Sequence, residues 1–134
     1  MQQYTVTLPA FPRGFHIITK YILNAIPSMP SIGLVNIFIQ HTSAGLSINE
    51  AADPTVLTDF ENSFNQFIPE NQTFYTHLDE GSDDMPAHIK SSIVGSSISI
   101  PISNHKFNLG TWQGIYLCEF RNYGGPRSLV ITVF

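Results

Sequence analysis

Residues His77–Lys90 read HLDEGSDDMPAHIK and place two histidines and four carboxylates around one glycine and one proline. Only 12% of the chain is charged, so this density is unusual within it. The glycine permits a turn that a β-carbon would disfavour. Asp83 or Asp84 can cap a helix that carries proline in its first turn. His88 then lies about one turn into the helix, and the turn brings His77 into the same volume. We expect this loop and helix start to form the functional site.

The composition predicts a single domain over residues 1–134, long enough to bury a core without disulfides or metal staples. The six Lys and Arg residues are scattered and the formal net charge is -4, which argues against a nucleic-acid partner. No apolar run approaches the roughly 20 residues of a membrane helix, and the N-terminus lacks the layout of a signal peptide. We therefore expect a cytoplasmic protein with no membrane partner. The single cysteine, Cys118, lies in a strand pattern and is expected to be a buried structural thiol.

The remaining pattern predicts an α+β fold, mainly antiparallel β-sheet with two or three helices. One helix is expected to begin at Asp53-Pro54 and end before Pro69, with its aromatic stripe packed in the core. Another is expected over Met85–Val94, ending at Gly95, and a third over Ile18–Ile26. The expected extended segments are 4–8, 32–40, the stretch through Asn49, 73–76, 97–102, 114–121 and 128–134, the last two joined as a hairpin.

Three of the five histidines stand where a regular element meets a polar loop, so their side chains are expected to face a cleft. They are His41, His77 and His88. Three histidines from separate elements match the ligand number of an open catalytic zinc site. No local histidine pair fixes the geometry, so metal binding, acid–base or phosphate-binding chemistry, and ordinary hydrogen bonding are all compatible with the spacing. His16 and His105 have contexts that indicate no functional role.

Two carboxylates are candidate catalytic groups. One of Asp83 and Asp84, with Asp84 as the assignment, is expected to accept a histidine N–H and fix its tautomer. Glu119 follows four mostly apolar residues in a strand that should be half-buried. A buried carboxylate needs a partner or a raised pKa. Arg121, Lys90 or an active-site histidine is the expected partner, and a structural ion pair is the alternative.

Polar and aromatic groups supply candidates for substrate binding. The side chains that follow His41, Asn49 among them, can hold an oxyanion or phosphate together with Lys90 and Arg121. Hydrogen bonding within a β-bend explains them equally well. Trp112, the only tryptophan, stands between glycines. It can stack on a flat ligand, close a subunit interface or pack in the core.

Three segments in this order resemble the YjbQ family, also known as UPF0047 or the secondary thiamine-phosphate synthase family. They are HTSAGLSINE at 41–50, the opening stretch at 77–90, and LGTWQGIYLCE at 109–119. The resemblance spans nearly the whole chain. It implies an α+β fold, a cytoplasmic homotrimer, and a metal site at His41, His77 and His88. The implied ion is a divalent metal, zinc, with magnesium as the alternative for a phosphate substrate.

The activity implied by the resemblance is a weak thiamine-phosphate synthase reaction. This transferase reaction joins a pyrimidine diphosphate to a thiazole phosphate and releases pyrophosphate, and a divalent cation helps the leaving group depart. Trp112 would stack the pyrimidine, while Lys90 and Arg121 would steady phosphate. Family membership does not specify the physiological substrate. We expect a metal-dependent small-molecule enzyme, with a non-catalytic metabolite-binding or regulatory module as the alternative.

Overall fold

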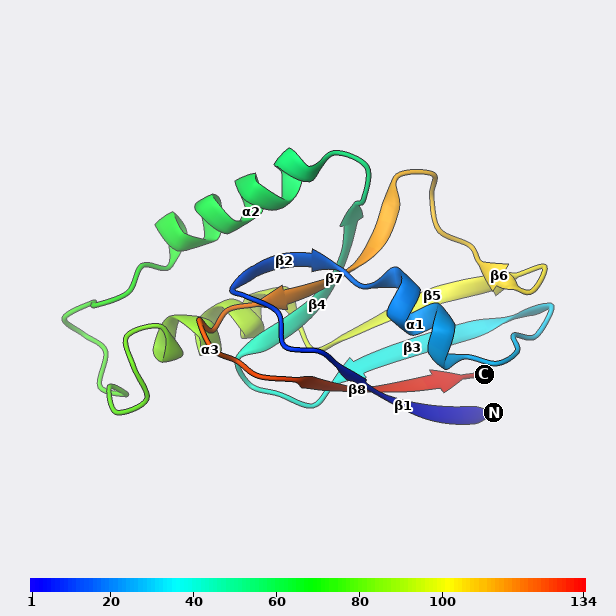
Figure 1. The fold of residues 1–134 in the computed structure, drawn as a ribbon, viewed down its shortest axis with the longest axis horizontal. Coiled ribbons are helices and arrows are strands. Elements are labelled where there is room, and N and C mark those ends of the chain that lie inside the picture. The colour runs from blue at the N-terminus through cyan, green and yellow to red at the C-terminus, as the bar shows by residue number, and fades with distance from the viewer.

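Two antiparallel sheets form the body of the protein, as the computed structural model of residues 1–134 shows (Figure 1). The larger sheet has the strand order β1-β8-β3-β5-β6 and the smaller one β2-β7-β4. The strands are β1 (Gln2–Leu8), β2 (Gly14–Ile17), β3 (Ile32–Ile39), β4 (Ala44–Glu50), β5 (Ser97–Ser103), β6 (Lys106–Phe107), β7 (Gln113–Glu119) and β8 (Arg127–Val133). Every paired neighbour is antiparallel. With three helices added, the predicted α+β class is confirmed.

The main core is a cluster of sixteen buried apolar side chains that come from both sheets and from the region of helix α1 (Thr19–Ala25). Ile18, Ile22 and Ile26 recur every four residues and therefore lie on one face of this helix, pointing into the core. A seven-residue helix is marginal by itself, whereas each fully buried isoleucine contributes about 1.5–3 kcal/mol. Packing therefore stabilises this helix, whose presence the sequence predicted.

Strand β7 is buried on both faces, which makes it the central element of the molecule. Its residues Ile115 and Leu117 face the main core, while Tyr116 and Cys118 belong to a second cluster. Helices α2 (Pro54–Phe67) and α3 (Asp84–Val94) contribute to that second cluster. The structure confirms Cys118 as a buried thiol, and burial raises its pKa. The last residue of β7, Glu119, is completely buried as well.

Helix α2 begins and ends where the sequence predicted. Asp53 accepts a hydrogen bond from the Thr55 N–H and Pro54 opens the first turn. Its aromatic stripe packs only in part. The ring centroids of Phe60 and Phe64 lie 5.3 and 5.4 Å from that of Phe15. Phe67, by contrast, is exposed, as is Gln66 beside it near the end of the helix.

Helix α3 also has the predicted end, because Gly95 follows it with a φ of 105°, a conformation that favours glycine. Its start differs from the expectation. Asp83 occupies the capping position, but its side chain makes no capping hydrogen bond. It accepts instead from Arg121 Nε and from the backbone N–H of Asn122. A charged donor makes the stronger hydrogen bond, so the carboxylate faces arginine rather than the helix.

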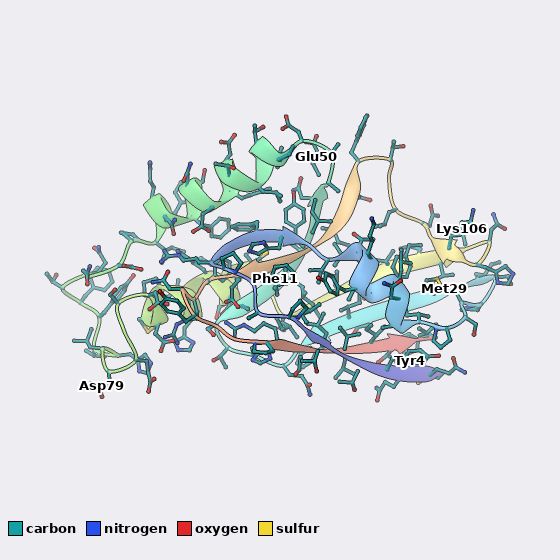
Figure 2. The ribbon with its side chains drawn as sticks, viewed as in Figure 1. Tyr4, Phe11, Met29, Glu50, Asp79 and Lys106 are labelled. Carbon is teal, nitrogen blue, oxygen red and sulfur yellow. The ribbon has the colours of Figure 1, made fainter.

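Two predicted strand features are wrong. Residues 114–121 and 128–134 do not form a hairpin, because β7 and β8 lie in different sheets and the segment between them crosses from one sheet to the other. Residues 73–76 form no strand, since no other strand lies alongside to pair with them. They belong to the long loop between α2 and α3, whose outer part holds Asp79, far from Met29 and Lys106 (Figure 2).

None of the helices has both the length and the apolar composition that crossing a bilayer requires.

Candidate functional site

His77, Asp84 and His88 meet at the N-terminal end of α3. Asp84 is the first residue of the helix and His88 lies one turn later, so both side chains occupy the same face. His77 Nε2 lies 2.8 Å from Asp84 Oδ2, and His88 Nε2 lies 3.1 Å from the same oxygen. One potential ligand atom from each residue lies within 4.8 Å of the others. The loop thus brings the two imidazoles together, with ring centroids 5.4 Å apart.

The orientation of His88 is fixed by the main chain. Its Nδ1 lies 2.9 Å from the carbonyl oxygen of Thr42. A carbonyl can only accept, so Nδ1 carries a hydrogen. In a neutral ring Nε2 then bears a lone pair, and this is the atom that faces the Asp84 carboxylate. Two lone pairs at this distance repel each other, so the geometry requires a proton or a metal cation between them.

Asp84 is only 3% exposed, yet its environment keeps it ionised. Burial alone would raise its pKa. Hydrogen bonding from His77 and the charges of His88 and Arg121 more than offset burial, and the pKa falls below the ordinary value of 3.8. Arg121 donates to Asp84 Oδ1 at 2.5 Å, to Asp83 at 2.9 Å and to the Glu80 carbonyl at 2.8 Å. One guanidinium therefore holds both the carboxylate and the preceding loop.

The residues of this cluster fit a zinc ion. Two imidazole nitrogens and one carboxylate oxygen are a donor set of open zinc sites. The Thr42 carbonyl on His88 and the guanidinium of Arg121 on Asp84 are the outer contacts that orient ligands in such sites. Magnesium prefers oxygen ligands throughout, so the two imidazoles favour zinc.

A cavity of about 380 Å³ opens beside His88. Its lining consists of His41, Thr42, Ala44, His88, Ser91, Ser92, Gly95 and Ser96. It therefore presents hydroxyls, imidazoles and backbone, and it contains no carboxylate, lysine or arginine. Because His88 belongs to both the cluster and the lining, a metal ion and a ligand in this cavity would be neighbours.

His41 lines the cavity but stands outside the cluster. Its Nε2 accepts a hydrogen bond from the backbone N–H of Ser128 at 2.8 Å. Of the expected ligands His41, His77 and His88, the structure brings His77 and His88 together with Asp84, whereas His41 lies outside this cluster. The reason is physical, because the nitrogen that bears the lone pair of His41 already faces a backbone donor.

Glu119 and Lys90 are engaged inside the fold. Arg127, a partner that the sequence had not indicated, donates to Glu119 through Nε at 2.7 Å and Nη2 at 2.5 Å. Lys90 is 1% exposed and donates to Asn65 of α2 at 2.8 Å. It lies two residues after His88, and such spacing turns a side chain away from the neighbouring face of a helix. Neither residue lines the histidine cavity.

Asn49 and Trp112 come together, but away from the histidines. Both line a cavity of about 290 Å³ with Ile48, Glu50 and Gln113. Asn49 lies near the end of β4, whereas the histidine cavity includes Ala44 at its start. Trp112 is 65% exposed there. The structure thus separates the expected substrate-binding residues into three places, because Asn49 and Trp112 line this cavity, Arg121 holds Asp84 and Lys90 contacts Asn65.

Several contacts of the site were missed by sequence reasoning. The Thr42 carbonyl and the Ser128 N–H act through the main chain, which any residue possesses, so no residue type signals them. Arg127 had a usable signal. It opens a strand that is apolar at alternate positions, and an arginine there must find a buried carboxylate.

The comparisons with known proteins agree along the whole chain. The sequence model of the family described as UPF0047 protein YjbQ-like matches residues 4–134. The chain is 47% identical over 133 residues to the UPF0047 protein YjbQ of Salmonella typhimurium, covering 98% of this chain and 96% of that protein. It is 44% identical over 96 residues to the UPF0047 protein YugU of Bacillus subtilis, covering 72% and 68%.

Solved structures of the same fold also match this chain over nearly its whole length. A conserved hypothetical protein from Thermus thermophilus superposes with a TM-score of 0.87 at 30% identity, covering 97% of this chain and 98% of that one. An uncharacterised conserved protein of the yjbq/upf0047 family from Clostridium acetobutylicum superposes with a TM-score of 0.81 at 33% identity, covering 100% of each chain.

Proposed function

We propose that this chain, which belongs to the YjbQ-like UPF0047 family of uncharacterised proteins, is a metal-dependent enzyme acting on a small polar molecule. The family membership and the geometry of the histidine cluster are the premises of this proposal. In this proposal His77, Asp84 and His88 hold a zinc ion. The observation that carries the proposal is the meeting of two imidazole nitrogens and one carboxylate oxygen, all within 4.8 Å of one another. The ion would offset negative charge on the substrate and assist a leaving group.

The chain's own groups would bind and orient the substrate. Ser92, Ser96 and Thr42 contribute to the wall of the cavity that shares His88 with the cluster. No charged side chain lines this cavity, so a negatively charged substrate would depend on the metal for charge compensation. This dependence favours small, weakly charged substrates over polyphosphates.

The reaction implied by the family resemblance joins a pyrimidine diphosphate to a thiazole phosphate and releases pyrophosphate. We assign it to this chain only as a weak, secondary activity. Lys90 and Arg121, expected to steady phosphate, are bound to Asn65 and to the two aspartates. Trp112, expected to stack the pyrimidine, lines the other cavity. With these groups engaged elsewhere, such highly charged substrates would receive little help.

A second candidate function is a non-catalytic metabolite-binding or regulatory module. One observation favours it specifically. Glu119, the carboxylate expected to act in catalysis, is closed in an ion pair with Arg127, and no carboxylate lines the histidine cavity. The cavity would then capture a small metabolite without a carboxylate base to transform it.

The resemblance also implies a homotrimer, and we include this assembly in the proposal. Its support in this chain is the set of large apolar side chains that β3 leaves exposed, Ile32, Leu34 and Phe38. Light scattering of the purified protein measures the assembly. A monomeric mass would remove it from the proposal without affecting the metal site.

Elemental analysis of zinc-loaded, gel-filtered protein tests the metal site. We expect one zinc per wild-type chain and little in His88→Ala or Asp84→Asn. His105→Ala is the matched control, because His105 lies in a surface turn and contacts the Met29 carbonyl, outside the cluster. Wild-type zinc content in His88→Ala would refute the site.

Turnover separates the two candidate functions. Zinc-loaded protein is incubated with the pyrimidine diphosphate and the thiazole phosphate, and product is followed by chromatography. Product that disappears in His88→Ala but persists in His105→Ala supports the enzyme. Saturable thermal stabilisation by metabolites without any product supports the binding module.

A further inference from the structure

We propose that His41 is a substrate-binding residue whose Nδ1–H donates a hydrogen bond to an anionic oxygen, phosphate or carboxylate, in the cavity beside His88. The inference deepens the proposed function, on which it rests for the neighbouring metal ion. It assigns His41 a role as a donor rather than as a metal ligand.

The tautomer of His41 follows from its partner. The backbone N–H of Ser128 points at His41 Nε2 across 2.8 Å. A backbone N–H can only donate, so Nε2 carries the lone pair. The proton of the neutral ring then resides on Nδ1. A metal could bind Nδ1 only after that proton had been removed, which is why His41 suits hydrogen bonding and not ligation.

The surroundings keep this ring neutral. Burial, and then the positive charge of Arg127, lower the pKa of His41, while the charge of Glu119 opposes them. The frame is also rigid, because Ser128 directly follows Arg127, which is held by Glu119 and by the Ser43 hydroxyl at 3.0 Å. A neutral imidazole fixed on a buried ion pair is a pre-oriented donor.

The cavity wall favours a ligand that accepts hydrogen bonds. One acceptor at the wall, the Thr42 carbonyl, already receives hydrogen bonds from His88 Nδ1 at 2.9 Å and from Ser91 Oγ at 2.7 Å. No carboxylate lines the wall to repel an anion. The hydroxyls of Ser92 and Ser96 add two further groups able to donate. An anionic oxygen therefore fits this wall better than a cation.

Two substitutions of His41 distinguish the role of its Nδ1–H donor from that of the Nε2 contact with the Ser128 N–H. Asparagine places its amide nitrogen near the position of Nδ1, whereas glutamine can place its amide oxygen near Nε2. Inorganic phosphate and acetate are titrated into zinc-loaded protein and followed by NMR. We expect His41→Gln to weaken binding by about tenfold or more, and His41→Asn to stay within about threefold of wild type, since a hydrogen bond to a charged group contributes about 1.5–3 kcal/mol. Both variants should keep wild-type zinc content.

Each outcome of the titration decides something. Saturation by phosphate alone or by acetate alone identifies the oxyanion class, and both results support the proposal. Wild-type affinity in His41→Gln overturns it. Loss of zinc from His41→Gln also overturns it, because His41 would then be a metal ligand. Binding of neither anion by zinc-loaded wild-type protein overturns it as well.

A second measurement needs no variant and no metal. Long-range proton–nitrogen correlation spectra of the zinc-free wild-type protein report which nitrogen of His41 is protonated. The proposal expects the neutral ring with its proton on Nδ1, and a proton on Nε2 overturns it. Because this readout is independent of zinc, failure of the donor role is distinguishable from failure of the proposed metal site.

Discussion

Glu119 and Asp84 are both buried carboxylates paired with arginine, but their remaining contacts differ. Both oxygens of Glu119 accept from the single guanidinium of Arg127. Asp84 gives only Oδ1 to Arg121, while its Oδ2 faces Nε2 of His77 and of His88. The first carboxylate is closed by the Arg127 guanidinium and by the backbone N–H of Arg121, which donates to Oε2 at 3.2 Å. The second keeps an oxygen directed at two imidazoles.

The number of oxygens given to the arginine distinguishes a structural buried carboxylate from one suited to binding. Burial of a carboxylate requires a compensating positive charge, and a single bidentate arginine supplies it completely. Asp84 uses only one oxygen on its arginine, so its second oxygen, directed at two imidazoles, can still face a proton or a metal ion. The Glu119–Arg127 pair therefore holds the end of β7 to the start of β8, whereas the Asp84 cluster is suited to binding.

The largest effect should come from breaking the closed pair. Glu119→Ala leaves the Arg127 guanidinium buried without its partner, and we expect the free energy of unfolding to fall by about 3–5 kcal/mol. Urea denaturation measures it. Asp84→Asn should destabilise much less, because Arg121 keeps Asp83 as a carboxylate partner, whereas Arg127 has only Glu119.

A double variant serves as control for that experiment. Removing both charges with Glu119→Leu and Arg127→Met should recover much of the loss, because no buried charge is left unpaired. If Glu119→Ala unfolds at the wild-type urea concentration, the pair contributes nothing and the distinction between the two carboxylates fails.

The surroundings of Gly124 show how tightly the Glu119–Arg127 pair is packed. A β-carbon added at this position would collide with Glu119 Oε1 and lie 2.7 Å from Arg127 Nη2. We expect Gly124→Ala to lower the free energy of unfolding by about 1–3 kcal/mol, the usual effect of overpacking. Gly125→Asn is the matched control, since Gly125 has open space around it and asparagine tolerates its φ of 70°. Equal effects at the two glycines would contradict the steric explanation.

Local patterns in the sequence predicted most of the fold. The Asp53-Pro54 start and the Gly95 end of the helices depend on capping chemistry within a few residues, and the structure has both. The relation between β7 and β8 could not be predicted in this way. Two apolar strands joined by a short glycine-rich segment look like a hairpin whether the segment turns back or crosses to the second sheet. Packing over the whole domain decides between a hairpin and a crossing. The periodicity of apolar residues carries no information about that packing.

The sequence likewise predicted part of the candidate site. Composition drew attention to the loop that brings His77 and His88 together, because charges are scarce elsewhere. The separation of His41 from that cluster depends on the Ser128 N–H, a main-chain group 87 residues away. Trp112 was expected to stack the pyrimidine only through the family resemblance, but it lies with Asn49 at the end of β4 that is away from the histidine cavity.

Arg121 offers a way to weaken the open cluster without touching a proposed ligand. Arg121→Lys keeps the positive charge but removes the planar fork that joins Asp83 and Asp84. We expect zinc affinity to fall by about tenfold, the lower range for loss of an outer contact, as measured by competition with a chelator. Arg13→Lys is the control, because Arg13 contacts Glu70 and Asn65 instead. Unchanged affinity in Arg121→Lys would mean that Asp84 needs no guanidinium to face the histidines.

The smallest effect is expected at Asp53, an exposed carboxylate that completes the comparison. Its side chain accepts from the Thr55 N–H at 2.9 Å and hydroxyl at 2.8 Å, and these bonds lower its pKa below 3.8. Because the folded pKa lies below the unfolded one, the charge stabilises the protein above pH 3.8 and this contribution is lost as pH falls through the folded pKa. Asp53→Ala should therefore lower the urea midpoint slightly at neutral pH, and the charge-dependent part of the difference should shrink in acid. A difference that grows in acid would reverse the sign of this linkage. Solvent screens this carboxylate, so neither a cation nor a buried arginine is needed to keep it ionised.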